Sequence, residues 1–169
     1  MAYLSIWDLL LPPIYIFLIY VVSSYRKHKL ERINPAYKYY TAGLMAKIVC
    51  SIAICLVYTV YYTSGDSTGY YEQAVVLHNL LFESPTHFFE ILFNGSNAQN
   101  YNYLNDTTGY IAYNTWINDY SAMYITRLIT PLCIISFNSF ITTTIMLAWI
   151  CYPGVWKLYL LFCEQFPKI

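Results

Sequence analysis

The chain has 169 residues, of which 58% are hydrophobic and only 11% are charged. A soluble domain carries about 25% charged residues, so a globule of this composition could not cover its surface in water, whereas in lipid it could. The formal net charge is zero, and this balance gives no indication of a nucleic-acid partner. The twenty tyrosines and four tryptophans suit side chains at the headgroup level of a bilayer.

The first apolar segment covers about residues 5–24, and about 20 apolar residues span a bilayer. Pro12 and Pro13 are expected to kink this helix or to mark its true start. No positive charge precedes the apolar core, and no small-residue cleavage pattern follows it. We therefore do not expect a signal peptide.

Positive charge is concentrated after this segment, because five of the nine Lys and Arg residues lie between Arg26 and Lys38. Short loops rich in Lys and Arg stay in the cytoplasm, so the N-terminus is predicted to lie outside. The second apolar segment runs from about residue 41 to residue 62. Lys47 within it is expected to extend back toward the inner membrane face.

Residues 63–127 form a polar stretch in which no Lys or Arg occurs before Arg127. The contrast with the basic loop predicts that this stretch is extracytoplasmic. Apolar residues at three- and four-residue spacing predict amphipathic helices over 69–83 and 85–93, which lie flat on the bilayer or pack on other spans of the protein. The Asn- and Tyr-rich residues 94–118 predict a loop, with a short hairpin as one option.

The third apolar segment, about residues 128–150, is unusually polar. Its Ser, Asn and Thr side chains between Ser136 and Thr144 are expected to face other helices and hydrogen-bond with them. Pro153-Gly154 is predicted to end the helix, leaving residues 153–169 as an amphipathic cytoplasmic tail. The sequence thus predicts an all-α polytopic membrane protein. It has a single membrane domain over residues 1–169, with about three transmembrane helices and amphipathic interfacial helices in an extracytoplasmic loop.

The cysteines and histidines give no metal pattern. The five cysteines are odd in number and form no CxxC pair, which favours small packing residues over a zinc or redox site. His78 and His87 lie on the two predicted amphipathic helices without metal-ligand spacing, as ordinary polar or interface residues do.

Chemistry is most strongly suggested by the run Gly65-Asp66-Ser67-Thr68-Gly69-Tyr70-Tyr71-Glu72, directly after the second apolar segment. Asp66 has two interpretations. Either it caps the following helix or stabilises its positive end, or it acts at the outer membrane face. There it would take a proton from an attacking sugar hydroxyl or hold a divalent cation.

Arg127 is the only Lys or Arg of the predicted outer loop. It serves either as an interfacial anchor or as a clamp for a lipid phosphate, whose oxygens a guanidinium contacts in bidentate fashion. Asp119 and Glu72 suit solvated or capping positions.

The second span ends in Tyr61-Tyr62 and is followed by Gly65-Asp66-Ser67-x-x-Tyr70-Tyr71. This pattern resembles the start of the first outer loop in bacterial polytopic membrane glycosyltransferases of the GT-C type, which use polyprenyl-phosphate sugars. It is also similar to that of some capsule and O-antigen polymerases. Arg127 and the runs at 118–121 and 154–159 are similar to those of large bacterial membrane proteins of this kind.

The resemblance implies that Asp66 is the catalytic or metal-binding residue and that the flat helices shape an acceptor cleft. The expected substrate-binding residues are Arg127, Tyr70, Tyr71 and Asp119. The expected partners are the lipid bilayer, a polyprenyl-phosphate-linked sugar and other transmembrane helices, with a divalent cation as the candidate cofactor. The expected location is the inner (plasma) membrane of a bacterium, which the chain crosses several times.

Two departures from this pattern matter. The acidic loop follows the second span here and the first span in the usual pattern, and such enzymes have many more spans. The chain is therefore expected to be the N-terminal part of a larger protein or a truncated relative, and its final residues 166–169 favour the first. The rival hypothesis is a non-catalytic membrane subunit that binds partner helices through its polar third span.

Overall fold

The computed structural model describes residues 6–62 and 65–166, and every regular element in these two ranges is helical. This confirms the predicted all-α fold. In chain order the elements are α1 (Trp7–Glu31), η1 (Pro35–Tyr39), α2 (Tyr40–Leu56), η2 (Val57–Tyr61), α3 (Asp66–Glu83), α4 (Pro85–Asn94), η3 (Asn100–Tyr103), α5 (Tyr113–Asn118), α6 (Tyr120–Ile135) and α7 (Phe140–Gln165).

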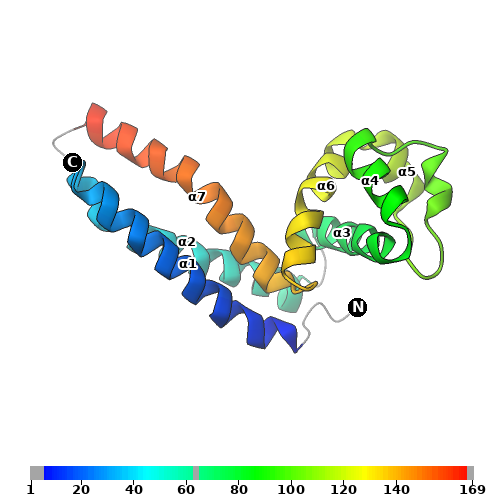
Figure 1. Ribbon diagram of the computed structural model, residues 1–169, viewed down its shortest axis with the longest axis horizontal. Coiled ribbons are helices and arrows are strands. Elements are labelled where there is room, and N and C mark those ends of the chain that lie inside the picture. The colour runs from blue at the N-terminus through cyan, green and yellow to red at the C-terminus, as the bar shows by residue number, and fades with distance from the viewer. Residues whose placement is uncertain (1–5, 63–64, 167–169) are drawn as a thin grey trace.

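Within the described residues, three helical segments are long and apolar enough to cross a membrane: α1, the continuous stretch Pro35–Tyr61, and α7. They form one bundle, in which the C-terminal ends of α1 and α7 lie at the same end (Figure 1). The opposite end of the bundle carries the helices α3 to α6 (Figure 1). The prediction of a polytopic α-helical membrane protein with three spans is confirmed.

The boundaries of the third span differ from the prediction of 128–150. Residues 128–135 belong to α6, and the span α7 begins only at Phe140. Between the two helices the chain turns through Phe137 and Asn138, whose φ angles are 51° and 55°. The run Ser136-Phe137-Asn138-Ser139 contains turn residues, but the apolar residues on both sides of it made the whole of 128–150 read as one span.

The predicted break at Pro153-Gly154 is also wrong, because α7 continues through Pro153 to Gln165. A proline is tolerated inside a membrane helix when neighbouring groups satisfy the backbone. Here Tyr152 and Trp156 are buried on either side of it. The predicted tail is therefore the last part of a span, as far as residue 166; residues 167–169 lie outside the described ranges.

The bundle is held by close packing between α2 and α7. Leu44 and Ile48 of α2 and Ile145 of α7 are fully buried. The Tyr152 hydroxyl donates a hydrogen bond to the Tyr40 carbonyl at 2.8 Å. Gly43 permits this approach, because a Cβ atom at that position would lie 2.5 Å from the Tyr152 hydroxyl oxygen.

Helices α3 to α6 form a second unit with its own core, which we call the α3–α6 unit (residues 66–135). Its core includes Trp116, Leu77 and Ile91, and the Trp116 Nε1–H donates to the Asn97 carbonyl at 2.9 Å. The two predicted amphipathic helices are present as α3 and α4. The predicted loop 94–118 contains the short helices η3 and α5, and its described residues form no hairpin.

A buried polar junction joins this unit to the bundle. The Asp8 Oδ1 atom at the start of α1 accepts hydrogen bonds from the Ser139 hydroxyl at 2.7 Å and the Ile141 N–H at 3.0 Å. The Tyr71 hydroxyl of α3 donates to the Asn138 carbonyl. The Ser136 and Thr143 hydroxyls lie 2.6 Å apart. Most polar residues of the third apolar segment are thus buried, namely Ser136, Ser139, Thr142 and Thr143, and they bond within the chain.

Candidate functional site

The acidic motif lies where α3 begins. Asp66 is the first residue of α3 and its side chain is exposed. The Thr68 hydroxyl caps the N-terminus of α3, because it donates to the Gly65 carbonyl at 2.7 Å and accepts from the Gly65 N–H at 2.9 Å. A Cβ atom at residue 65 would lie 2.6 Å from the Tyr58 ring, so glycine is required for this approach. Asp66 therefore stands where a carboxylate stabilises the helix N-terminus.

Of the other predicted site residues, Tyr70 lies one helical turn after Asp66 on α3, whereas Tyr71 and Asp119 have structural roles. Tyr71 is buried, with its hydroxyl on the Asn138 carbonyl, and burial raises the pKa of this hydroxyl above its ordinary value. It stays protonated and acts as a structural donor. Asp119 is the N-cap of α6, since its Oδ1 accepts from the Ala122 N–H at 2.9 Å. Tyr70 is partly buried on α3.

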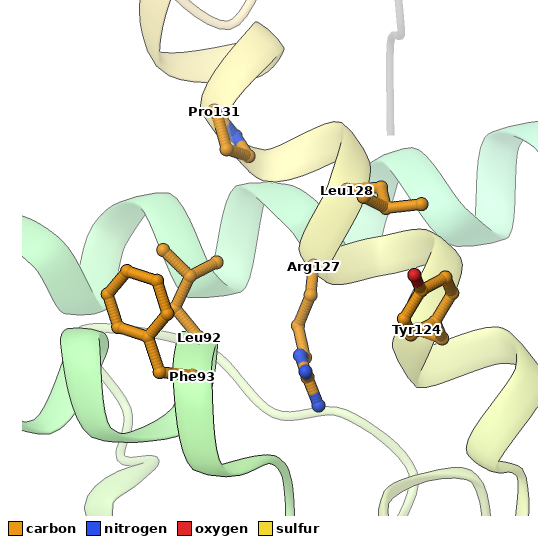
Figure 2. Close-up of a pocket in the computed structure, with 6 residues that line it drawn as sticks. All are labelled: Leu92, Phe93, Tyr124, Arg127, Leu128 and Pro131. Carbon is orange, nitrogen blue, oxygen red and sulfur yellow. The ribbon is translucent and has the colours of Figure 1, made fainter.

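Arg127 reaches into a cavity between α4 and α6. Figure 2 shows its side chain extending from α6 toward the space between Phe93 of α4 and Tyr124 of α6. The cavity has a volume of about 350 Å³, and apart from Arg127 its walls are apolar or aromatic. Its lining residues are Leu92, Phe93, Tyr124, Arg127, Leu128 and Pro131. Asp66 does not line it, so the structure keeps these two candidate residues in separate places.

The guanidinium of Arg127 is incompletely satisfied. Its Nε is buried and has no hydrogen-bond partner among the described residues. A Cβ atom at Gly95, the C-cap of α4, would lie 3.0 Å from Nη1, so one side of the guanidinium faces the negative end of a helix. A buried donor without a partner costs about 1–3 kcal/mol. An anion that used Nε together with one Nη would remove this cost.

The structure offers no ready-made metal centre. In residues 6–62 and 65–166, no group of three or more His, Cys, Asp or Glu side chains could hold a metal ion. A divalent cation at Asp66 would therefore take most of its ligands from water or substrate, as Mg²⁺ commonly does.

A hydrogen-bonded turn secures the far end of α3. Glu83 accepts from the Asn105 Nδ2 and from the Thr107 hydroxyl, each at 2.6 Å. These bonds, that from Thr107 above all, hold the pKa of the Glu83 carboxyl below its usual value. A carboxyl whose pKa is lower in the folded state stabilises the fold above the unfolded pKa, about 4.3 for Glu, and loses this contribution as pH falls through the folded value.

Thr107→Val is expected to raise the pKa of Glu83, so that turn 104–109 loosens at a higher pH than in the wild type. Hydrogen–deuterium exchange of this turn, followed from pH about 6 to about 3 across the Glu range, measures the effect. Thr107→Ser keeps the hydroxyl and should behave as the wild type. Identical pH profiles for the Val and Ser variants would show that the hydroxyl does not control the turn.

Sequence reasoning gave no role to Asp8, and it predicted Gly95 only as the C-terminal signal of the second amphipathic helix, which its position as the C-cap of α4 confirms. Asp8 could have been noticed as an ionisable residue in an apolar segment, a position that requires a partner. The neighbours of Arg127 on α4 had no such signal, because Leu92 and Phe93 are 34 or more positions away in the chain.

Comparisons of the chain with protein-family models, with curated proteins and with solved structures find no match. The chemistry of the site therefore rests on the geometry of its own residues.

Proposed function

We propose that this integral membrane protein binds a phosphate-bearing membrane lipid through Arg127. A polyprenyl-phosphate-linked sugar is the proposed ligand class, and the protein would act in membrane sugar transfer or polysaccharide assembly. The observation that carries the proposal is the buried, unpartnered Nε of Arg127 in the cavity between α4 and α6.

The cavity supports a lipid ligand better than a small soluble anion. A guanidinium binds a phosphate through two parallel hydrogen bonds, and the unpartnered Nε of Arg127 leaves one such donor free. The flanking side chains are large and exposed: Phe93 at 74%, Tyr124 at 59% and Leu128 at 59%. Such walls suit the isoprenoid or acyl chain that follows a lipid phosphate, whereas a soluble anion would gain nothing from them.

The proposal is tested by lipid binding in nanodiscs of phosphatidylcholine that contain a polyprenyl monophosphate, with bound lipid measured by native mass spectrometry. A hydrogen bond to a charged group contributes about 1.5–3 kcal/mol, so Arg127→Gln is expected to weaken binding roughly 10- to 100-fold. Arg127→Lys keeps the charge but not the bidentate geometry, so its affinity for the monophosphate should lie between those of the wild type and Arg127→Gln.

Two controls sharpen this test. Lys157→Gln removes an exposed cation of α7 and should leave binding unchanged. The corresponding polyprenol, which has no phosphate, should bind equally to the wild type and to Arg127→Gln. Wild-type affinity for the monophosphate in a folded Arg127→Gln variant would rule out Arg127 as the phosphate contact.

Within this proposal Asp66 is the base or metal-binding residue of a glycosyl transfer at the outer face of a bacterial plasma membrane. Its exposure at the start of α3 leaves the carboxylate accessible. Asp66→Asn in the full-length protein removes the base but preserves the shape of the side chain, so sugar transfer is expected to fall by at least about 100-fold. Unchanged transfer would remove Asp66 from the mechanism.

The alternative proposal is a non-catalytic membrane subunit that binds partner helices. The polar residues that motivated it bond within the chain, so partner helices would pack on the exposed apolar side chains of α1, such as Leu9, Phe17 and Val21. A stable stoichiometric partner in mild detergent, without sugar transfer, would favour this subunit over the enzyme.

A further inference from the structure

We infer that the outer surface of α4 and α6 is immersed in the lipid leaflet, so that the Arg127 cavity opens sideways to the bilayer and takes its ligand from within the membrane. We call this surface the α4–α6 face; it consists of Phe89, Phe93, Tyr124, Leu128 and Ile135. The inference rests on the proposed function only for the ligand; the immersion stands on its own observations.

The first observation is the depth of α6. The Tyr15 hydroxyl donates a hydrogen bond to the Ile135 carbonyl at 2.7 Å. Tyr15 lies eight residues after Trp7, the first residue of the span α1, which corresponds to about 12 Å along the helix. The C-terminal end of α6 therefore lies beside the first turns of a membrane span, and five residues after Ile135 the chain enters the span α7.

The second observation is the character of the α4–α6 face. Its five side chains are between 50% and 74% exposed, and none is charged. A continuous apolar surface of this kind marks an interaction with a membrane or another apolar partner. Ile135 is 51% exposed and lies beside Tyr15 of the span α1, so the face adjoins a membrane span there, and this adjacency favours lipid as the occupant.

Another part of the surface of the α3–α6 unit, at the C-terminal end of α3, differs. Phe82 of α3 is 75% exposed, but it borders a hollow formed with Asn79, Glu83 and Thr107. The polar and charged side chains around Phe82 indicate that this part of the surface is in contact with water. The unit thus has one side for lipid and one for water, with Arg127 on the lipid side, eight residues before Ile135. This position suits the guanidinium to the headgroup phosphates.

Site-directed spin labelling tests the inference. Single cysteines are introduced at Phe93, Leu128 and Phe82 in a chain whose exposed cysteines, Cys50, Cys151 and Cys163, are replaced by alanine. Each protein is labelled with a nitroxide and reconstituted in phosphatidylcholine vesicles. Collision with oxygen, which concentrates in lipid, is compared with collision with a water-soluble nickel chelate. A label at Phe17, 65% exposed on the span α1, provides the lipid reference.

Labels at 93 and 128 are expected to resemble that at 17, with high oxygen and low nickel accessibility, whereas the label at 82 should show the reverse. Inference and proposed function fail separately: if the labels at 93 and 128 match that at 82, the face is in water, even where Arg127-dependent lipid binding persists. Three labels that all resemble that at 17 would also overturn the inference, because the α3–α6 unit would then have no water-facing side at 82. Displacement of the bound lipid by inorganic phosphate as readily as by added polyprenyl monophosphate would contradict a ligand that enters from within the membrane.

Discussion

Gly43→Ala is expected to destabilise the bundle by roughly 2–4 kcal/mol, the sum of overpacking in a tight core and the loss of one buried hydrogen bond. The new methyl group would lie 2.5 Å from the Tyr152 hydroxyl oxygen. Tyr152 cannot withdraw easily, because it is 3% exposed, bonds to the Tyr40 carbonyl and lies against the Trp156 ring at 6.1 Å. Unfolding of the purified protein in mixed detergent, titrated with a denaturing detergent, measures the change.

A second substitution makes this prediction specific. Tyr152→Phe removes the clashing oxygen, and the next ring atom would lie 3.6 Å from the methyl group, an ordinary contact. Gly43→Ala should therefore cost much less in the Tyr152→Phe background than in the wild type. Gly154→Ala of α7, where no heavy atom lies within 4 Å, is the matched control and should be nearly neutral. Equal costs of Gly43→Ala in both backgrounds would disprove the contact.

Asp8→Ala is expected to destabilise the protein by roughly 1–3 kcal/mol, because it leaves the buried Ile141 N–H without its acceptor. The Ser139 hydroxyl also loses Asp8 and keeps Thr142 Oγ1, 2.7 Å away, as its acceptor. Asp8→Asn keeps one acceptor oxygen and should lose less. The hydrogen bonds that are lost hold the start of α7 and its junction with the α3–α6 unit. Protease accessibility around residues 136–141 should therefore rise.

Unfolding of the Asp8 variants in the same detergent titration gives the free-energy change. Asp66→Ala is a suitable comparison, because it also removes a carboxylate from the first turn of a helix, but an exposed one. It should cost no more than about 1 kcal/mol. Equal effects of Asp8→Ala and Asp66→Ala would mean that burial of Asp8 has no energetic consequence.

The number and type of spans followed from composition, because apolar runs of about 20 residues have few alternatives to a membrane helix. The turn at Phe137 and Asn138 did not follow from composition, because the polar run from Ser136 to Ser139 is too short to divide an apolar stretch into two helices. At Pro153 the sequence predicted a break that is absent. Local propensity favoured a helix end there, but packing of Tyr152 and Trp156 in the bundle core keeps the helix continuous.

The candidate site was predictable only in part. Arg127 was noticeable as an isolated cation in a long acidic stretch, but the cavity around it is formed by contact of α4 with α6, which periodicity does not reveal. The motif tyrosines illustrate the limit. Tyr70 and Tyr71 are adjacent in the chain, yet only Tyr71 is buried at the junction with the bundle, because consecutive helical residues point to different sides.

The account depends most directly on the two ends of the bundle lying on opposite sides of the membrane, with the α3–α6 unit outside. Single cysteines at Lys29 and at Asn102, both exposed, are labelled in whole cells with a membrane-impermeant maleimide. The account predicts labelling at 102 in intact cells and at 29 only after permeabilisation. Labelling of both positions in intact cells, or of position 29 alone, would contradict it.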